Sequence, residues 1–148
     1  MNQLRHILAA VDFSEPAQAA FDHALGLSRA HGADLTVVHA VANDQRFRRH
    51  ARARVQLIAK MRQGAQAAGV RFAVSVQQGD PAGVILVHAR ASRPDLLVMG
   101  THQRTGLDRL RIGSVAEHVV VKAAQPVLIV PAGGRTGVIR PFTSITAA

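Results

Sequence analysis

A regular alternation of short apolar runs with segments of helical spacing is the strongest constraint on the fold of this chain. Five runs have the composition and length of buried strands: 4–11, 35–40, 71–78, 96–99 and 126–130. Between them, apolar residues recur at helical spacing over about 14–31, 55–68, 81–92 and 114–123. Strands that alternate with helices form a parallel sheet covered on both faces, because each helix carries the chain back across the sheet. Right-handed crossovers then favour a doubly wound open sheet in an α/β domain.

Local signals indicate where some of these elements begin or lie. Asp80 is a good N-cap, and Pro81 suits the first position of the helix that follows it. Ser114 and Glu117 have the spacing of a capping box at the start of the last helix. The run 71–78 alternates more cleanly than the others, which favours a strand at the edge of the sheet.

The composition excludes several classes of protein. With 148 residues of which 48% are hydrophobic, the chain is long enough for one domain with a real core. The absence of cysteine excludes disulfides, thiolate metal sites and thiol catalysis. No run reaches the ~18 apolar residues of a membrane span, and the first residues do not resemble a signal peptide. We therefore expect a soluble cytoplasmic protein with no membrane partner.

The charge is strongly basic, with 18 Lys and Arg against nine Asp and Glu. Such a surface attracts polyanions, which include nucleic acids and nucleotide triphosphates. Aromatic residues make up only 3% of the chain, so the base-stacking platform of a single-strand binder is not expected. We interpret the basic run 46–54 as a solvated face, and nucleic acid is not an expected partner. The alternative, nucleic-acid binding through this run, predicts a steep dependence on salt.

The chemistry is concentrated in the stretch 98–117, where a buried strand leads into a loop with three glycines and three arginines and then into a helix. Backbone N–H groups, a positive helix end and cationic side chains together form a plausible cradle for an anion. The stretch matches neither a Walker A motif nor the dinucleotide-binding glycine motif. Asp12 and Gly100 both follow strands, and they would flank one crevice if those strands are neighbours.

The spacing of this stretch, Gly100-x2-Gln103-x9-Gly113-Ser114, resembles the universal stress protein family. Nucleotide-binding members of that family carry Gly-x2-Gly-x9-Gly-Ser/Thr at this place. The resemblance extends from residue 4 to about 131. It includes further segments that follow or precede the predicted strands: Ala10-Val11-Asp12-Phe13-Ser14, Val38-His39-Ala40, Gly79-Asp80-Pro81, Met99-Gly100-Thr101-His102, Gly113-Ser114-Val115-Ala116-Glu117 and Pro126-Val127-Leu128-Ile129-Val130.

The resemblance implies a five-stranded parallel sheet in the order 3-2-1-4-5, of the adenine nucleotide alpha-hydrolase-like type. It also implies a stress-response or signalling module that binds ATP, with Mg²⁺ held by Asp12, and that forms a homodimer through its last strand. Adenine and ribose would lie near Ala10, Val11, Asp12 and Ala40. The phosphates would lie along Gly100, Gln103, Gly113, Ser114 and Val115, and Met99 and Arg104 complete the predicted set of binding residues. The signalling partner is not specified.

The chain departs from the family motif at Gln103, which stands where nucleotide-binding members have a second glycine. A glutamine there would carry a strain of ~1 kcal/mol if the position needs a positive φ. Two alternatives therefore stay open: a nucleotide-free interaction module, and a slow ATPase in which Asp12 holds Mg²⁺ and His102 acts as base. No residue is assigned a catalytic role. Asp12 and Ser114 could also serve only as helix caps.

The segment after Pro131 is set apart by Gly133-Gly134-Arg135-Thr136-Gly137, which reads as a linker. We expect residues 1–131 to form the family domain. Residues 132–148 are expected to be a tail, an edge or swapped strand, a disordered end or the first strand of a second repeat.

Overall fold

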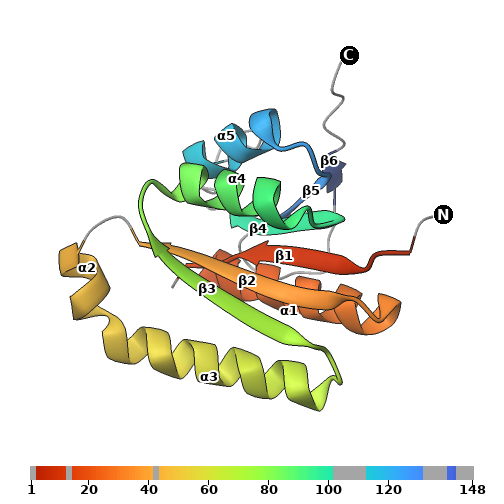
Figure 1. Cartoon of the computed structure of the whole chain (residues 1–148), viewed down its shortest axis with the longest axis horizontal. Coiled ribbons are helices and arrows are strands. Elements are labelled where there is room, and N and C mark those ends of the chain that lie inside the picture. The colour runs from red at the N-terminus through yellow and green to blue at the C-terminus, as the bar shows by residue number, and fades with distance from the viewer. Residues whose placement is uncertain (1–2, 13–14, 42–43, 102–112, 132–139, 143–148) are drawn as a thin grey trace.

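The computed structural model describes residues 3–12, 15–41, 44–101, 113–131 and 140–142 as one α/β sheet structure (Figure 1). The sheet order is β3-β2-β1-β4-β5-β6. Its parallel strands are β1 (His6–Ala10), β2 (Asp34–Val41), β3 (Phe72–Gln78), β4 (Leu96–Thr101) and β5 (Val127–Pro131). The predicted order 3-2-1-4-5 is confirmed, and β3 lies at the edge as its alternating pattern predicts.

A sixth strand, β6 (Arg140–Phe142), pairs antiparallel with the outer edge of β5. The predicted sheet of five parallel strands is therefore extended by a short strand from the C-terminal segment. Three residues of that segment have a described strand conformation, which agrees with an edge strand as one of the expected possibilities.

Helices cover both faces of the sheet (Figure 1). The helices α1 (Glu15–His31) and α3 (Ala51–Ala67) lie on one face, and α4 (Pro81–Ser92) and α5 (Ser114–Lys122) lie on the other. Burial follows the alternation of each strand. Ile7 and Ala9 pack in the core beneath α1, whereas Leu8 and Ala10 pack in the core beneath α4 and α5. Two apolar cores, one on each face, therefore hold the strands in place.

The basic run 46–54, interpreted above as a solvated face, is helical; its arginines Arg48, Arg49 and Arg52 are exposed, whereas Arg54 is buried. The run forms the short helix α2 (Asp44–Arg49) and the first turn of α3, which begins at Ala51. The buried stripe of α3 consists of Arg54, Met61 and Ala65, so its first member is an arginine rather than a hydrophobic residue. Arginine has high helix propensity and a long apolar stem, so it can extend a helix beyond its apolar residues.

Two predicted helix starts have different outcomes. At α4, Asp80 is the N-cap, and its carboxylate accepts a hydrogen bond from the N–H of Gly83 at 2.9 Å, as predicted. At α5, the predicted capping box is wrong. The N-cap is Gly113, and Ser114 is the first residue of the helix. A glycine N-cap has no side chain to accept from the first turn, so backbone donors of α5 remain for other partners.

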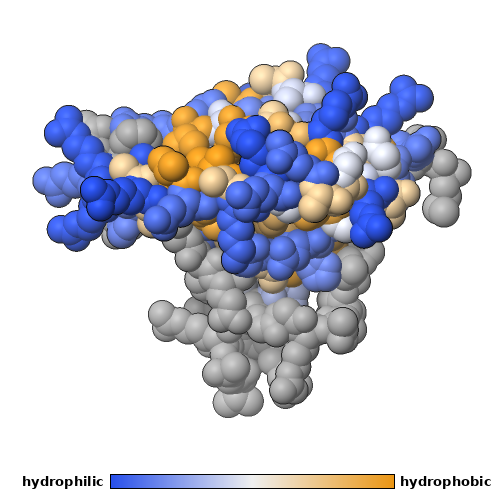
Figure 2. All heavy atoms as spheres, turned by 90° about the horizontal axis from the view of Figure 1, so that it is seen from below, coloured by the Kyte–Doolittle hydropathy of each residue, from blue (hydrophilic) through white to orange (hydrophobic). Residues whose placement is uncertain are grey.

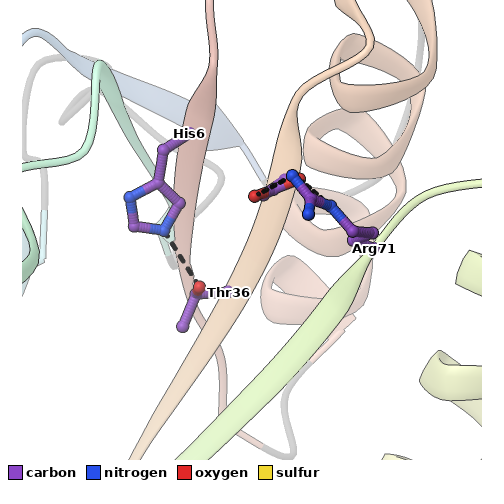
Figure 3. Close-up of polar contacts among 4 residues, drawn as sticks. His6, Thr36 and Arg71 are labelled. Carbon is purple, nitrogen blue, oxygen red and sulfur yellow. Dashed lines mark hydrogen bonds and ion pairs between the residues drawn. The ribbon is translucent and has the colours of Figure 1, made fainter.

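Polar contacts fix the strands at their N-terminal ends. Figure 3 shows Nε2 of His6 next to the hydroxyl of Thr36, at 2.9 Å, which links β1 to β2. The guanidinium of Arg71 donates two hydrogen bonds to the carboxylate of Asp34 (Figure 3), which links β2 to the start of β3. The carboxylate of Asp95 accepts from two backbone N–H groups just before and within β1. These contacts fix the register that sets the positions of the opposite strand ends.

Candidate functional site

A cavity of about 260 Å³ lies at the C-terminal ends of β1, β2 and β4. The strand order reverses at β1, because the chain continues to β2 on one side and returns to β4 on the other. Register places Ala10 beside both Val38 and Met99, so the ends of these three strands are level. A crevice at this point is the usual ligand site of an open α/β sheet.

Nine of the eleven predicted site residues line the cavity, and they come from four separate parts of the chain. These nine are Ala10, Val11, Asp12, Ala40, Met99, Gly100, Gly113, Ser114 and Val115. The other two predicted residues, Gln103 and Arg104, lie outside the described residues, as does His102. The structure therefore brings together most of the set that the sequence singled out.

The end of β1 is held by two hydrogen bonds to β2. The N–H of Val11 donates to the carbonyl of Val38 at 3.0 Å. The carbonyl of Val11 in turn accepts from Nδ1 of His39 at 2.7 Å. His39 is only 5% exposed, whereas the next residue of the β1 end, Asp12, is exposed at the cavity. The buried imidazole thus positions the backbone that carries the aspartate.

This role of His39 was not predicted from the sequence. The sequence signal for this role is the place of His39 near the end of a buried strand, directly before the small residue Ala40. Alternation along β2 places Ala40 on the opposite face from His39, in the lining of the cavity. One segment therefore supplies both a positioning group and a cavity wall.

The first turn of α5 forms another wall of the cavity. The N–H of Gly113 donates to the hydroxyl of Thr101 at 3.0 Å, and Thr101 is 4% exposed. This bond joins the end of β4 to the start of α5. The N–H groups of Ser114 and Val115 belong to the first turn, where a helix has no acceptors of its own. These donors and the positive end of the helix dipole suit an anion.

Gly113 itself has φ −54° and ψ 155°, an extended conformation that any residue can adopt. A Cβ built there would meet the Thr101 hydroxyl at 3.8 Å, which is ordinary van der Waals contact. Backbone geometry therefore does not require a glycine at this position. What it does provide is a helix start without a side chain over the first N–H groups.

An apolar wall was missed by the sequence reading. Pro81 and Ile85 reach the cavity from the first turns of α4, and Ala17 reaches it from α1. The available signal was topological: Gly79-Asp80-Pro81 follows a strand, so the start of that helix must lie at the same end of the sheet as Asp12. With Val38, Thr101 and Ala116, these residues complete the lining.

The cavity therefore combines a largely apolar interior, one exposed carboxylate and the start of a helix. Such a site suits a ligand with a flat apolar part and an anionic part. Within the described ranges, no group of three or more His, Cys, Asp or Glu side chains is placed to hold a metal ion. Nor does that part of the chain contain a helix long and apolar enough to cross a membrane.

Comparison with known proteins identifies the family. The model of the universal stress protein family matches residues 3–131. The chain belongs to the universal stress protein family. A universal stress protein of Thermus aquaticus is 37% identical over 132 residues, which cover 84% of this chain and 96% of the relative. One of Methanocaldococcus jannaschii is 30% identical over 141 residues, which cover 87% of this chain and 83% of the relative.

Solved universal stress proteins share the fold. One from Burkholderia pseudomallei is 28% identical and has a TM-score of 0.70, with 89% of this chain and 99% of that chain covered. One from Archaeoglobus fulgidus, solved in complex with dAMP, is 22% identical with a TM-score of 0.68 and covers 87% of this chain and 99% of its own. A third, in complex with cAMP, is also 22% identical with a TM-score of 0.68, and the match covers 89% of this chain and 100% of that chain.

Proposed function

We propose that this universal stress protein binds an adenine nucleotide, with ATP as the expected ligand, in the cavity at the ends of β1, β2 and β4. The observation that carries the proposal is the convergence of Asp12, Ala40 and the first turn of α5 on one cavity. Two members of the family with the same fold were solved with cAMP and dAMP, which supports an adenine nucleotide as the class of ligand.

The proposed orientation follows from the chemistry of the walls. The adenine ring would lie in the apolar part of the cavity, next to Ala40 and Ile85, where small or aliphatic side chains accept a flat ring. Asp12 would accept hydrogen bonds from the ribose hydroxyls or contribute to a Mg²⁺ site. The phosphates would lie at the first turn of α5, against the N–H groups of Ser114 and Val115. Gln103 and Arg104 remain predicted members of the phosphate site.

We further propose that the protein acts as a stress-response or signalling module in the cytoplasm, with little or no catalysis. The described lining of the cavity offers one carboxylate and no histidine, so it lacks the paired base and orienting group of a hydrolase. Any slow hydrolysis would depend on residues outside the described ranges, such as His102. The predicted division into a domain of residues 1–131 and a C-terminal segment belongs to the same proposal.

A homodimer through the last strand is also proposed. The outer edge of β5 is paired with β6 in this structure. Such a dimer would therefore extend the sheet at β6, or two copies would exchange this strand. Sedimentation of the full chain with and without ATP–Mg²⁺ measures the oligomeric state, and a monomer under both conditions would contradict this part of the proposal.

The test of nucleotide binding is calorimetric titration of the full chain with ATP–Mg²⁺ and with dAMP. We expect saturable binding by the wild-type protein. Ala40→Leu adds three carbon atoms to a side chain that lines the cavity, and it should weaken binding at least tenfold. The cost to folding should be small because Ala40 is only partly buried.

Ala73→Leu is the matched control. Phe72 and Val74 pack into the core beneath α1, so alternation along β3 turns Ala73 to the same face of the sheet as Ala40. Ala73 is exposed and lies outside the cavity lining. Its replacement should leave the affinity unchanged. No binding by the wild-type protein at millimolar nucleotide would reject the proposal in favour of a nucleotide-free interaction module.

A further inference from the structure

Nearly all of the net positive charge of this chain comes from one segment of its sequence. Residues 45–79 contain eight Lys and Arg and no Asp or Glu, which accounts for +8 of the formal net charge of +9. The remaining 113 residues are nearly balanced, with ten basic and nine acidic residues. This segment includes α3 and β3 and all of α2 except its first residue. A segment of this length without any acidic residue generates a strong one-sided potential.

None of the residues of this segment lines the nucleotide cavity. The helix α3 covers the face of the sheet opposite to α4 and α5, whereas α2 follows β2 at the same end of the sheet as the cavity (Figure 1). Figure 2 looks onto the face with α2 and α3 and shows hydrophilic side chains over much of it, with a smaller hydrophobic patch among them. The positive charge of this face is therefore carried by residues outside the cavity lining.

Five cations of this segment have exposed side chains, and we call them the cation surface: Arg48, Arg49, Arg52, Lys60 and Arg62. Arg71 is also exposed, but its guanidinium is paired with the carboxylate of Asp34 at 2.8 Å. Among the described residues, no salt bridge joins a member of the cation surface to an acidic side chain. Arg54 is 7% exposed and forms part of the buried stripe of α3, so it is not included.

The composition of the cation surface favours phosphate as its partner. Four of its five members are arginines, whose planar guanidinium binds phosphate oxygens in pairs. The helix α3 has 17 residues and is about 25 Å long. Over the same distance along its axis, double-stranded nucleic acid presents a phosphate charge about every 1.7 Å. Arg52, Lys60 and Arg62 along α3 can thus contact several phosphates at once, and the arginines of α2 add to them.

Other polyanions fit this surface less well. A single strand would require exposed aromatic rings for base stacking. Phe72, the aromatic residue of β3, is partly buried, packs edge-on against Phe21 and lies 5.2 Å from the guanidinium carbon of Arg62. A membrane surface helix presents a broad apolar face, whereas Val55 is the exposed large hydrophobic residue described on α2 and α3.

We propose that the cation surface binds the phosphate backbone of double-stranded nucleic acid without reading its sequence. From the sequence, the run 46–54 was interpreted as a solvated face and nucleic acid was not an expected partner, with binding through this run as the alternative. The proposal takes up that alternative, because a backbone-binding mode needs no aromatic platform. This inference does not depend on the proposed nucleotide site, because the residues of the two surfaces do not overlap.

The experiment is fluorescence anisotropy of a labelled 24-bp DNA duplex titrated with the full chain at salt concentrations from 50 to 200 mM. If all five cations contact phosphates, the association constant should fall about 500-fold over this range, since each contact contributes ≈ 0.9 to the slope of log K against log salt. The triple variant R48Q/R49Q/R52Q should bind more weakly at 50 mM salt, and its association constant should fall only about 12-fold.

The matched control is R90Q/R93Q/K122Q, which removes three exposed charges from the opposite side of the sheet. Its net charge equals that of R48Q/R49Q/R52Q. It should keep the wild-type salt slope. The variant R48K/R49K/R52K retains the charges and should also keep the wild-type salt slope. Thermal unfolding followed by circular dichroism identifies any variant that does not fold. Equal weakening by the two glutamine variants would show an effect of net charge alone and overturn the proposal.

Three further results would overturn it. One is absence of duplex binding at 50 mM salt. Another is tighter binding of the single strand than of the duplex. The third is binding to vesicles of phosphatidylserine that depends on the same three arginines as strongly as duplex binding does.

Discussion

The hydrogen bond between Thr101 and Gly113 should be measurable as a local and specific contribution to stability. It joins the end of β4 to the first turn of α5, and the donor–acceptor distance is 3.0 Å. Thr101→Val replaces the hydroxyl with a methyl group of similar shape and leaves the N–H of Gly113 without its acceptor. Since Thr101 is only 4% exposed, water can replace the hydroxyl only in part. We expect a loss of about 1–2 kcal/mol in the free energy of unfolding.

The assay is urea unfolding, with hydrogen exchange of the Gly113 amide as the specific readout. A loss of this size corresponds to a melting temperature lower by about 3–6 °C for a chain of this length. Thr101→Ser is the control, because it retains the hydroxyl and loses only a buried methyl group, at a cost of about 0.8 kcal/mol. The Gly113 amide should exchange faster in the valine variant but not in the serine variant.

The reasoning is refuted if the Gly113 amide stays equally protected in Thr101→Val. In that case the hydroxyl does not hold the start of α5. A second readout links the bond to the site, since the first turn of α5 lines the cavity. Nucleotide affinity should fall several-fold in the valine variant and stay near the wild-type value in the serine variant.

Two further predictions concern carboxylates elsewhere in the fold. Asp80→Ala removes the side chain that accepts from the N–H of Gly83 and should cost about 1 kcal/mol in urea unfolding, whereas Asp80→Ser should restore most of it; equal stability of all three proteins would contradict the capping role. The pKa of Asp95 is lowered because its carboxylate accepts from the backbone N–H groups of Arg5 and His6. Its folded pKa therefore lies below its unfolded pKa, so its contribution to stability is present above about pH 4 and is lost as the pH falls through the lowered value. The stability difference between the wild-type protein and Asp95→Asn should accordingly be constant near neutral pH and shrink in acid, and a difference independent of pH would contradict this assignment.

Local patterns were sufficient for the five parallel strands and the four long helices of the fold. The strand and helix periods of the five apolar runs and the intervening segments predicted a parallel α/β sheet, and Asp80 with Pro81 marked the start of α4. The strand order came from the family resemblance, because periodicity does not say which strands are neighbours. The predicted capping box at Ser114 is wrong because Gly113 takes the N-cap position, which makes Ser114 the first helical residue and Glu117 the fourth.

In the candidate site, some residues were recognisable from the local sequence and others were not. Asp12, Gly100 and Ser114 were recognisable because strand ends and helix starts leave a signal in nearby residues. His39 and Ile85 were not, because their roles depend on contacts with distant segments: the first holds the carbonyl of Val11, and the second closes the cavity from α4.

The sequence by itself determined the kind of sheet, the apolar composition of its two cores and the excess of positive charge, since these depend on residue type and spacing alone. The tertiary structure decided which strand ends meet around the cavity and which face of the sheet carries the arginines of α2 and α3. The reason is that both depend on the path of the crossovers, which brings together residues far apart in the chain.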